Sequence, residues 1–208
     1  MRWSKFKDRD AVEIFDIIQN EVFPFIKEMT GDDETAFSKY MKGASLGFTN
    51  PGILSKTINS LDELYKDDIK SLDMQGDLYE YMLSKLSAAG QNGQFRTPKQ
   101  IRDMMVQLRK PSPDDMICDP ACGTAGFLIS AAEYIREHYP NMTDKQWELF
   151  DTDTFSGFET DPTMLRISAM NLMLHSITRP EVKWQDSISK NNEIKDRYDL
   201  ILANPPFT

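Results

Sequence analysis

The sequence is poor in cysteine and histidine, with two of each among its 208 residues. Cys118 and Cys122 lie in one short segment, and neither histidine is near them in sequence. This spacing fits neither a zinc site nor a disulfide framework. We therefore expect no metal centre, and we interpret both cysteines as small apolar residues that flank a turn.

Long apolar runs are also missing. A transmembrane helix needs roughly 18 or more consecutive apolar residues, and the opening MRWSKFKDRD lacks the apolar core of a secretory signal. We expect a cytoplasmic protein with no membrane partner. The composition, 40% hydrophobic and 27% charged, is typical of a folded globular chain.

Positive charge is scarce as well. The chain has 24 Lys and Arg against 33 Asp and Glu, which gives a formal net charge of −9. Because phosphate contacts by Lys and Arg supply most non-specific affinity for nucleic acids, this balance argues against a free-standing nucleic-acid binder. If DNA is the substrate, another surface must help to hold it.

The first 88 residues have the periodicity of amphipathic helices joined by polar turns. Pro24 should kink or end the first helix. The apolar face of the last helix comprises Leu78, Tyr81, Met82 and Leu86. We predict a small helical domain over residues 1–88, whose apolar stripes form a core or, as the alternative, a partner-binding surface.

From residue 89 onward, short strands alternate with helices. Thr97 and Pro98 form a helix start, with Thr97 as N-cap and Pro98 at the first helical position. The apolar face of this helix continues through Ile101, Met104, Met105 and Leu108. Strands are expected at 115–119, 155–159, 182–184 and 200–203. This alternation predicts an α/β domain over 89–208, with a parallel sheet and helices on both faces.

Ligands of open α/β sheets bind beyond the carboxyl ends of the strands. The first such segment is DPACGTAGF (119–127), here called the glycine turn. Gly123 and Gly126 allow a tight turn and a close approach of the backbone to a ligand. The segment has neither the Gly-Lys-Ser/Thr of a P-loop nor a GxGxxG pattern, so a nucleotide phosphate is not the obvious ligand. A plain strand-to-helix turn is the alternative.

Acidic residues follow the next two strands. Glu159 could accept hydrogen bonds from both hydroxyls of a ribose, or it could be a solvated strand-end carboxylate. Asp161 is better placed to cap the helix that begins at Pro162. Asp186 could accept a hydrogen bond from the exocyclic amine of an adenine, or form an Asx turn or helix cap. Together with the glycine turn, two acids suit an adenosine moiety without phosphates.

The fourth strand leads into NPPF (204–207). Pro205 and Pro206 remove two N–H donors, so nearby carbonyls can face outward as acceptors. Asn204 offers an amide, and Phe207 offers a flat face for stacking. Two acceptors beside an aromatic wall suit an amino group on a planar ring, although a strand that ends in a proline loop would explain any Pro-Pro by itself.

Four motifs in this order resemble the S-adenosyl-L-methionine-dependent amino-methyltransferases of DNA. The match is closest to the modification subunits of type I restriction-modification systems, which are N6-adenine methyltransferases. The motifs are GQFRTP (93–98), DPACGTAGFL (119–128), GFETDP (157–162) and NPPF (204–207). The resemblance covers at least residues 78–208. It implies a Rossmann-like methyltransferase domain that is truncated after its fourth strand and preceded by a small helical domain.

The resemblance also implies which residues bind the cofactor. They are Gly93, Gln94, Phe95, Arg96, Thr97, Pro98, Asp119, Gly123, Thr124, Ala125, Glu159 and Asp186. Residues 93–98 would close over the methionine end, with Thr97 near its carboxylate and Asp119 near its amine. Residues 123–125 would line the cofactor through backbone contacts. Glu159 would hold the ribose, and Asp186 is the candidate for the adenine amine. Arg96 replaces the family's usual second aromatic residue, so it is either a cofactor contact or a surface charge.

The catalytic motif implied by the resemblance is Asn204, Pro205, Pro206 and Phe207. A target adenine is flipped out of the duplex, and Phe207 would stack on it. The Asn204 side-chain oxygen and the Pro205 carbonyl would accept hydrogen bonds from N6. This contact aims the nitrogen lone pair at the methyl group, so that transfer needs no covalent enzyme intermediate. Cys122 would be a bystander.

Sequence recognition in this family is delegated to another subunit. The implied partners are double-stranded DNA, a specificity subunit and a restriction subunit. A protein glutamine methyltransferase, and a cofactor-binding or assembly fragment without independent activity, stay open as alternatives. Because a seven-stranded methyltransferase sheet needs further strands after NPPF, we expect this chain alone to bind the cofactor weakly and to methylate DNA poorly or not at all.

Overall fold

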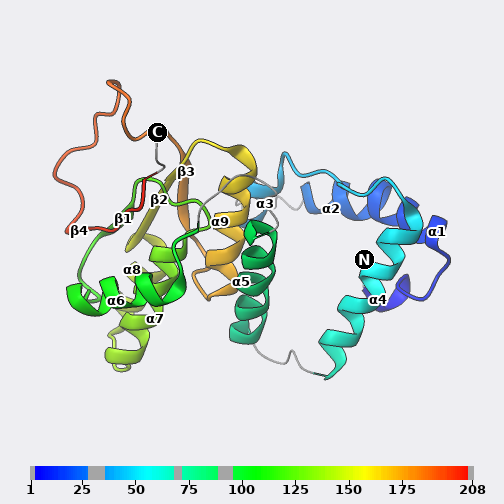
Figure 1. The fold of residues 1–208 in the computed structure, drawn as a ribbon, viewed down its shortest axis with the longest axis horizontal. Helices are drawn as coiled ribbons and strands as arrows, with labels where there is room; N and C mark the ends of the chain where they lie inside the picture. The colour runs from blue at the N-terminus through cyan, green and yellow to red at the C-terminus, as the bar shows by residue number, and fades with distance from the viewer. Residues whose placement is uncertain (1–2, 28–35, 68–71, 89–95, 206–208) are drawn as a thin grey trace. The chain divides into compact units, whose positions relative to one another are not determined.

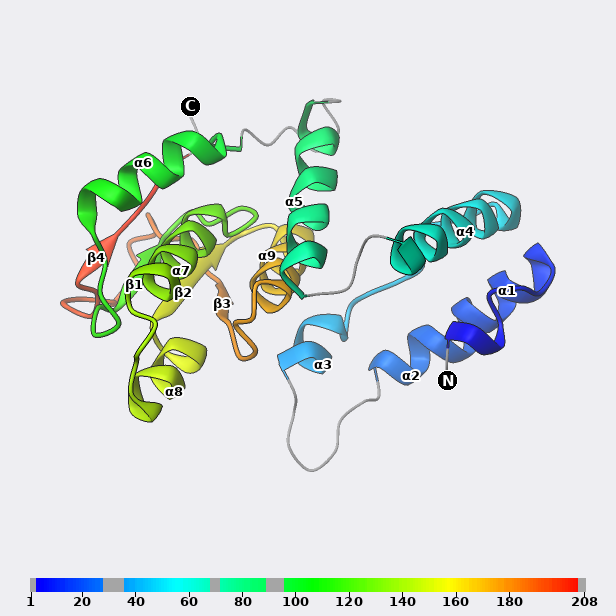
Figure 2. The same ribbon diagram turned by 90° about the horizontal axis from the view of Figure 1, so that it is seen from below.

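The computed structural model describes residues 3–27, 36–67, 72–88 and 96–205. The chain divides into two compact units, Met1–Met74 and Gln75–Thr208. Figures 1 and 2 show their elements in two views. Among the described helices, none is long and apolar enough to cross a membrane.

The first unit is helical. Its elements are a 3-10 turn (Trp3–Lys5), α1 (Ala11–Ile17), a π-helical turn (Ile18–Val22), α2 (Phe23–Lys27), α3 (Ala36–Met41) and α4 (Pro51–Asp67). Pro24 is the second residue of α2, so it does not end that helix. The π-helical turn stands just before it, where a proline without an N–H disturbs the regular hydrogen-bond pattern. A core of buried apolar residues comprises Phe6, Ile14, Ile17, Ile18, Leu54 and Ile58.

The second unit contains a parallel sheet. Its strands are β1 (Ile117–Asp119), β2 (Phe155–Glu159), β3 (Glu181–Trp184) and β4 (Leu200–Ile201). Its helices are α5 (Leu72–Ala88), α6 (Lys99–Arg109), α7 (Gly126–His138), α8 (Asp144–Thr152) and α9 (Pro162–Leu174). The strand order is β3-β2-β1-β4, and every pairing is parallel. The predicted α/β class and the predicted strand positions are confirmed.

The helices that pack on this sheet lie against one face. A Cβ built at Gly157 of β2 would lie 3.4 Å from Leu128 of α7, and Phe155 on the same face contacts Phe150 of α8. Crossovers between parallel strands are almost always right-handed, and those from β1 to β2 and from β2 to β3 step in one direction across the sheet. This rule places α7, α8 and α9 on the same face.

On the opposite face, the described residues that pack against the sheet come from irregular chain. The step from β3 back to β4 runs the other way, and residues 185–199 make it without a helix. Tyr198 from this segment packs edge-on against Phe158 of β2, and Arg197 pairs with Glu181 of β3. The prediction of helices on both faces is therefore wrong for the described part of the second unit.

Helix α5 belongs from Gln75 onward to the second compact unit, although the predicted division at residue 88 groups it with the helical region. Two contacts explain this placement. Glu80 forms an ion pair with Arg102 of α6, and a Cβ built at Gly76 would lie 2.8 Å from the His175 ring at the end of α9. The compact units therefore divide near residue 74.

The exposed faces of α5 and α6 also differ from expectation. Tyr81 is 59% exposed and Leu108 is 76% exposed, although the periodicity placed both on apolar faces. The buried residues of α6 are Arg102 and Val106, and Arg102 is only 4% exposed. Both helices occur where they were predicted, but α6 buries Arg102 while Leu108 of its predicted apolar face is exposed.

Candidate active site

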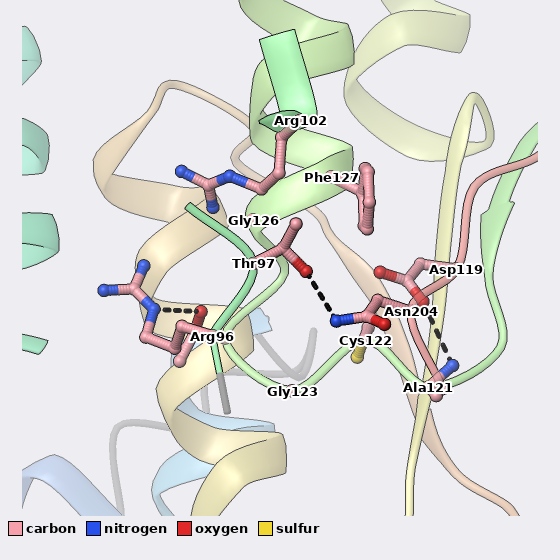
Figure 3. Close-up of a pocket in the computed structure, with 11 residues that line it drawn as sticks. Arg96, Thr97, Arg102, Asp119, Ala121, Cys122, Gly123, Gly126, Phe127 and Asn204 are labelled. Atoms are coloured by element: carbon pink, nitrogen blue, oxygen red, sulfur yellow. Dashed lines mark hydrogen bonds between the residues drawn. The ribbon is translucent and has the colours of Figure 1, made fainter. Parts of the chain in front are cut away.

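A pocket lies beyond the carboxyl end of β1 (Figure 3). The predicted site residues that line it are Arg96, Thr97, Asp119, Gly123, Thr124 and Asn204. They come from three segments that are far apart in the sequence: the approach to α6, the glycine turn and the end of β4. The fold therefore brings most of the described candidates to one place.

The glycine turn has a left-handed backbone at two positions. Gly123 has φ 52° and Ala125 has φ 63°. Glycine adopts this conformation freely, whereas alanine does so at a cost of about 1 kcal/mol. Ala125 is the N-cap residue of α7 and provides no side-chain cap, so the first N–H groups of α7 stay available near the pocket.

Asp119 is the buried carboxyl of the pocket, 2% exposed. Burial raises the pKa of Asp119 to about 7; a hydrogen bond from Ala121 N to Oδ1 (3.0 Å) opposes this shift, and the nearby Glu159 charge adds to it. A carboxyl with such a pKa can lose its proton and become negatively charged when a cation binds beside it.

Glu159 connects the end of β2 to the glycine turn. Its Oε2 accepts from Gly123 N at 3.1 Å, and its Oε1 accepts from the backbone N–H groups of Thr160 and Asp161. The carboxylate is therefore held by backbone donors. Asp161 caps α9 as predicted, because its Oδ1 accepts from Thr163 N and Met164 N.

Asp186 is exposed, and its Oδ1 accepts from Ile188 N at 3.1 Å. This is the Asx-turn contact that the sequence left open as an alternative. The structure thus gives Asp186 a local role, and its contact with a ligand stays a prediction.

Asn204 faces Thr97 across the pocket (Figure 3). Asn204 Nδ2 donates to Thr97 Oγ1 at 3.0 Å. Thr97 is not the N-cap of α6, as the sequence predicted, because α6 begins at Lys99 and Pro98 occupies the cap position without a side-chain bond. The Thr97 hydroxyl orients an amide from the opposite end of the domain instead.

Several predicted residues lie outside the described ranges, namely Gly93, Gln94, Phe95, Pro206 and Phe207. Pro205 is described and exposed, at the end of the chain segment that follows β4.

Arg96 points inward rather than to the surface. Its Nε donates to Thr124 Oγ1 at 3.1 Å, and its Nη2 donates to Glu80 Oε1 at 2.7 Å. Glu80 also accepts from Arg102 and Asn171. The sequence did not single out Glu80, Arg102 and Asn171, because no motif marks them and their partners lie in other segments of the chain.

Both cysteines are buried and free. Burial raises the pKa of Cys118 to about 12 and that of Cys122 well above its usual value, with the nearby Asp119 charge adding to both shifts. A thiol in this state is not a nucleophile, because the thiolate is the reactive form. The structure agrees with the interpretation of both residues as apolar packing groups.

Comparison with known proteins gives a consistent result. The family model described as N-6 DNA Methylase matches residues 70–208. The StySPI methylase subunit of a type I restriction enzyme from Salmonella potsdam is 28% identical over 99% of this chain and 41% of its own length. The corresponding EcoEI subunit from Escherichia coli is 28% identical over 93% of this chain and 41% of its own length.

Solved structures agree with the sequence matches. The crystal structure of a modification subunit from Vibrio vulnificus YJ016 superposes with a TM-score of 0.71 at 28% identity, over 89% of this chain and 40% of that one. The present chain thus spans about two fifths of the length of the relatives it matches.

Proposed function

Because this chain belongs to the N-6 DNA methylase family, we propose that it carries the cofactor site and the catalytic motif of an adenine-specific DNA methyltransferase. In this proposal a methyl group passes from S-adenosyl-L-methionine to N6 of an adenine in DNA. The observation that carries it is the position of Asn204. Its side chain lines the same pocket as Asp119 and the glycine turn, and Thr97 fixes its orientation.

The residues of the pocket fit the cofactor. S-adenosyl-L-methionine supplies a sulfonium-bound methyl group, and its methionine end carries an ammonium and a carboxylate. Asp119, buried and with a raised pKa, would take up the ammonium and become charged in doing so. The glycine turn would contact the cofactor through its backbone, and Glu159 at its edge would accept from the ribose hydroxyls. Residues 93–98 and Asp186 complete the proposed cofactor set.

Asn204 would act on the target amine. An amide that donates through Nδ2 to Thr97 has its Oδ1 left to accept, and no described residue donates to that oxygen. Together with the Pro205 carbonyl it would accept hydrogen bonds from both N–H groups of N6, which directs the nitrogen lone pair out of ring conjugation. Phe207 would stack on the base, and Pro206 would hold the backbone of the motif. The barrier is then lowered by positioning and by oriented dipoles.

The proposed partners follow from the relatives. The relatives from Salmonella potsdam and Escherichia coli are methylase subunits of type I restriction enzymes. We propose that double-stranded DNA is the substrate and that a specificity subunit and a restriction subunit are partners. The net charge of −9 disfavours binding of DNA by this chain alone, which supports the proposal that another subunit contributes to DNA binding.

Two measurements on wild type and Asn204→Ala test this function. Calorimetric titration should give the same affinity for S-adenosyl-L-methionine in both proteins, within a factor of about 3, because Asn204 serves the amine and not the cofactor. Transfer of tritiated methyl to an adenine-containing duplex should fall about 100-fold or more in the variant. Transfer is measured after this chain has been combined with two other components. One is a specificity subunit, and the other is a fragment that covers the part of the relatives' length that this chain does not span.

The controls separate the alternatives. A duplex already methylated at N6 should accept no label, and a protein substrate with exposed glutamines should accept none either. Equal transfer by wild type and Asn204→Ala, or preferential labelling of protein, would contradict the proposal.

A further inference from the structure

Glu80 of α5 is the acceptor for three side chains from three other segments. Its Oε1 accepts from Arg96 Nη2 at 2.7 Å and from Asn171 Nδ2 at 2.8 Å, and its Oε2 accepts from Arg102 Nη2 at 3.2 Å. Its main-chain carbonyl also accepts from Arg96 Nη1. We call Glu80, Arg96, Arg102 and Asn171 the Glu80 cluster.

The Glu80 carboxylate keeps its charge inside this cluster. Burial alone would raise the pKa of Glu80, but the charges of Arg102 and Arg96 and the hydrogen bond from Asn171 together lower it. The side chains are well enclosed, with 17% of Glu80, 14% of Arg96 and 4% of Arg102 exposed. Charge-assisted hydrogen bonds in such a site are stronger than those at an open surface.

Two members of the cluster also hold Thr124 in the glycine turn. Arg96 Nε donates to Thr124 Oγ1 at 3.1 Å, and Asn171 Nδ2 donates to the Thr124 carbonyl at 2.8 Å. Thr124 lies between Gly123 and Ala125, the two residues of the glycine turn that have a left-handed backbone. Such a backbone persists where surrounding contacts fix it.

The third arm of the cluster ends at the same turn. Arg102 Nη1 lies so close to Gly126 that a Cβ built there would be 1.6 Å from it. Arg102 Nε is buried and has no hydrogen-bond partner in the described part of the chain. The guanidinium forms an ion pair through its Nη2 with Glu80 Oε2. Removing the Glu80 charge would leave the Arg102 guanidinium buried without a counter-ion.

We propose that Glu80 is a positioning residue for the cofactor site. It acts through Arg96 and Asn171 on Thr124 and through Arg102 on Gly126, and so it fixes the glycine turn before the cofactor binds. The effect on cofactor binding rests on the proposed function, whereas the effect on the turn does not. Because a preformed site loses less entropy on binding, loss of the cluster should weaken cofactor affinity.

The test compares Glu80→Gln with Glu133→Gln in the full chain. Glu133 is a matched control because its carboxylate, on α7, also pairs with a cation from another segment, Lys99 Nζ at 2.6 Å. Amide hydrogen exchange is measured for residues 119–127 without cofactor, and affinity for S-adenosyl-L-methionine is measured by calorimetry. In Glu80→Gln we expect exchange about tenfold faster and affinity about tenfold weaker, with the control within about twofold of wild type.

A second variant guards against a general loss of folding. Arg96→Lys keeps a cation for Glu80 but removes the Nε donor to Thr124, so exchange should rise in the glycine turn and stay unchanged in α9. The proposal is overturned if amide exchange in the glycine turn is no faster in Glu80→Gln and Arg96→Lys than in Glu133→Gln. If wild type binds no cofactor, the proposed function fails, and the exchange comparison still decides the role of Glu80.

Discussion

At the scale of single residues, Asp119 and Asn204 depend on different environments within one pocket. Asp119 is buried at the end of β1, whereas Asn204 is exposed at the end of β4. Burial therefore controls the charge of Asp119, while a single hydrogen bond to Thr97 controls the orientation of Asn204.

The raised pKa of Asp119 predicts how stability changes with pH. The native state keeps a proton that the unfolded chain releases, so the contribution of Asp119 to the free energy of unfolding is full below about pH 4. That contribution falls as pH rises to about 7. Urea unfolding of wild type and Asp119→Asn at pH 5 and pH 8 should show wild type losing about 2 kcal/mol relative to the variant.

The lowered pKa values of Glu80 and Glu181 act in the opposite direction at more acid pH, and they cancel in this comparison because both proteins contain them. A difference between wild type and Asp119→Asn that does not change from pH 5 to pH 8 would show that Asp119 is charged in the folded protein.

At the scale of elements, α6 and α7 meet through a guanidinium and a glycine. Arg102 of α6 occupies the space beside Gly126, the first residue of α7. Gly126 is therefore required by a close approach of a side chain, and no left-handed backbone is involved. This contact fixes the start of α7 relative to the pocket.

Gly126→Ala should destabilise the second unit by about 1 to 3 kcal/mol, because the added methyl overlaps the buried Arg102 side chain. Gly47→Ala is the control, since nothing lies within 4 Å of a Cβ built there, and it should change stability by less than about 0.5 kcal/mol. Thermal unfolding monitored by circular dichroism measures both; equal effects would show that Arg102 moves aside freely.

At the scale of the whole molecule, each compact unit has its own buried core. The first unit buries residues of α1 and α4, and every residue that lines the pocket belongs to the second. Changes in the core of the first unit should therefore affect its own unfolding and leave the cofactor site intact.

Ile58→Ala tests this separation. Ile58 is 2% exposed in α4, so the variant should lose about 2 to 5 kcal/mol of stability in the first unit. Ile53→Ala in the same helix is the control, because Ile53 is 56% exposed. Calorimetric titration should give unchanged affinity for S-adenosyl-L-methionine in both; a parallel loss of affinity would show that the two units are coupled.

The sequence by itself determined the strands, the helices and the edge of the sheet at which the candidate pocket lies. Glycine turns, caps and strand ends are local features, so the strands, the Asp161 cap and the pocket at the end of β1 could be predicted from neighbouring residues. The order of the four motifs, a property of the whole chain, indicated the family to which the chain belongs.

Only the tertiary structure decided which faces are buried and what each polar side chain contacts. Periodicity cannot show that α6 buries Arg102 instead of its apolar stripe, because the partner that compensates the charge, Glu80, lies on another helix. In the same way, the sequence predicted that the Thr97 hydroxyl caps a helix, but in the fold it accepts a hydrogen bond from Asn204, 107 residues away. Long-range pairing of polar groups leaves no local pattern, and for that reason it had to be observed in the fold.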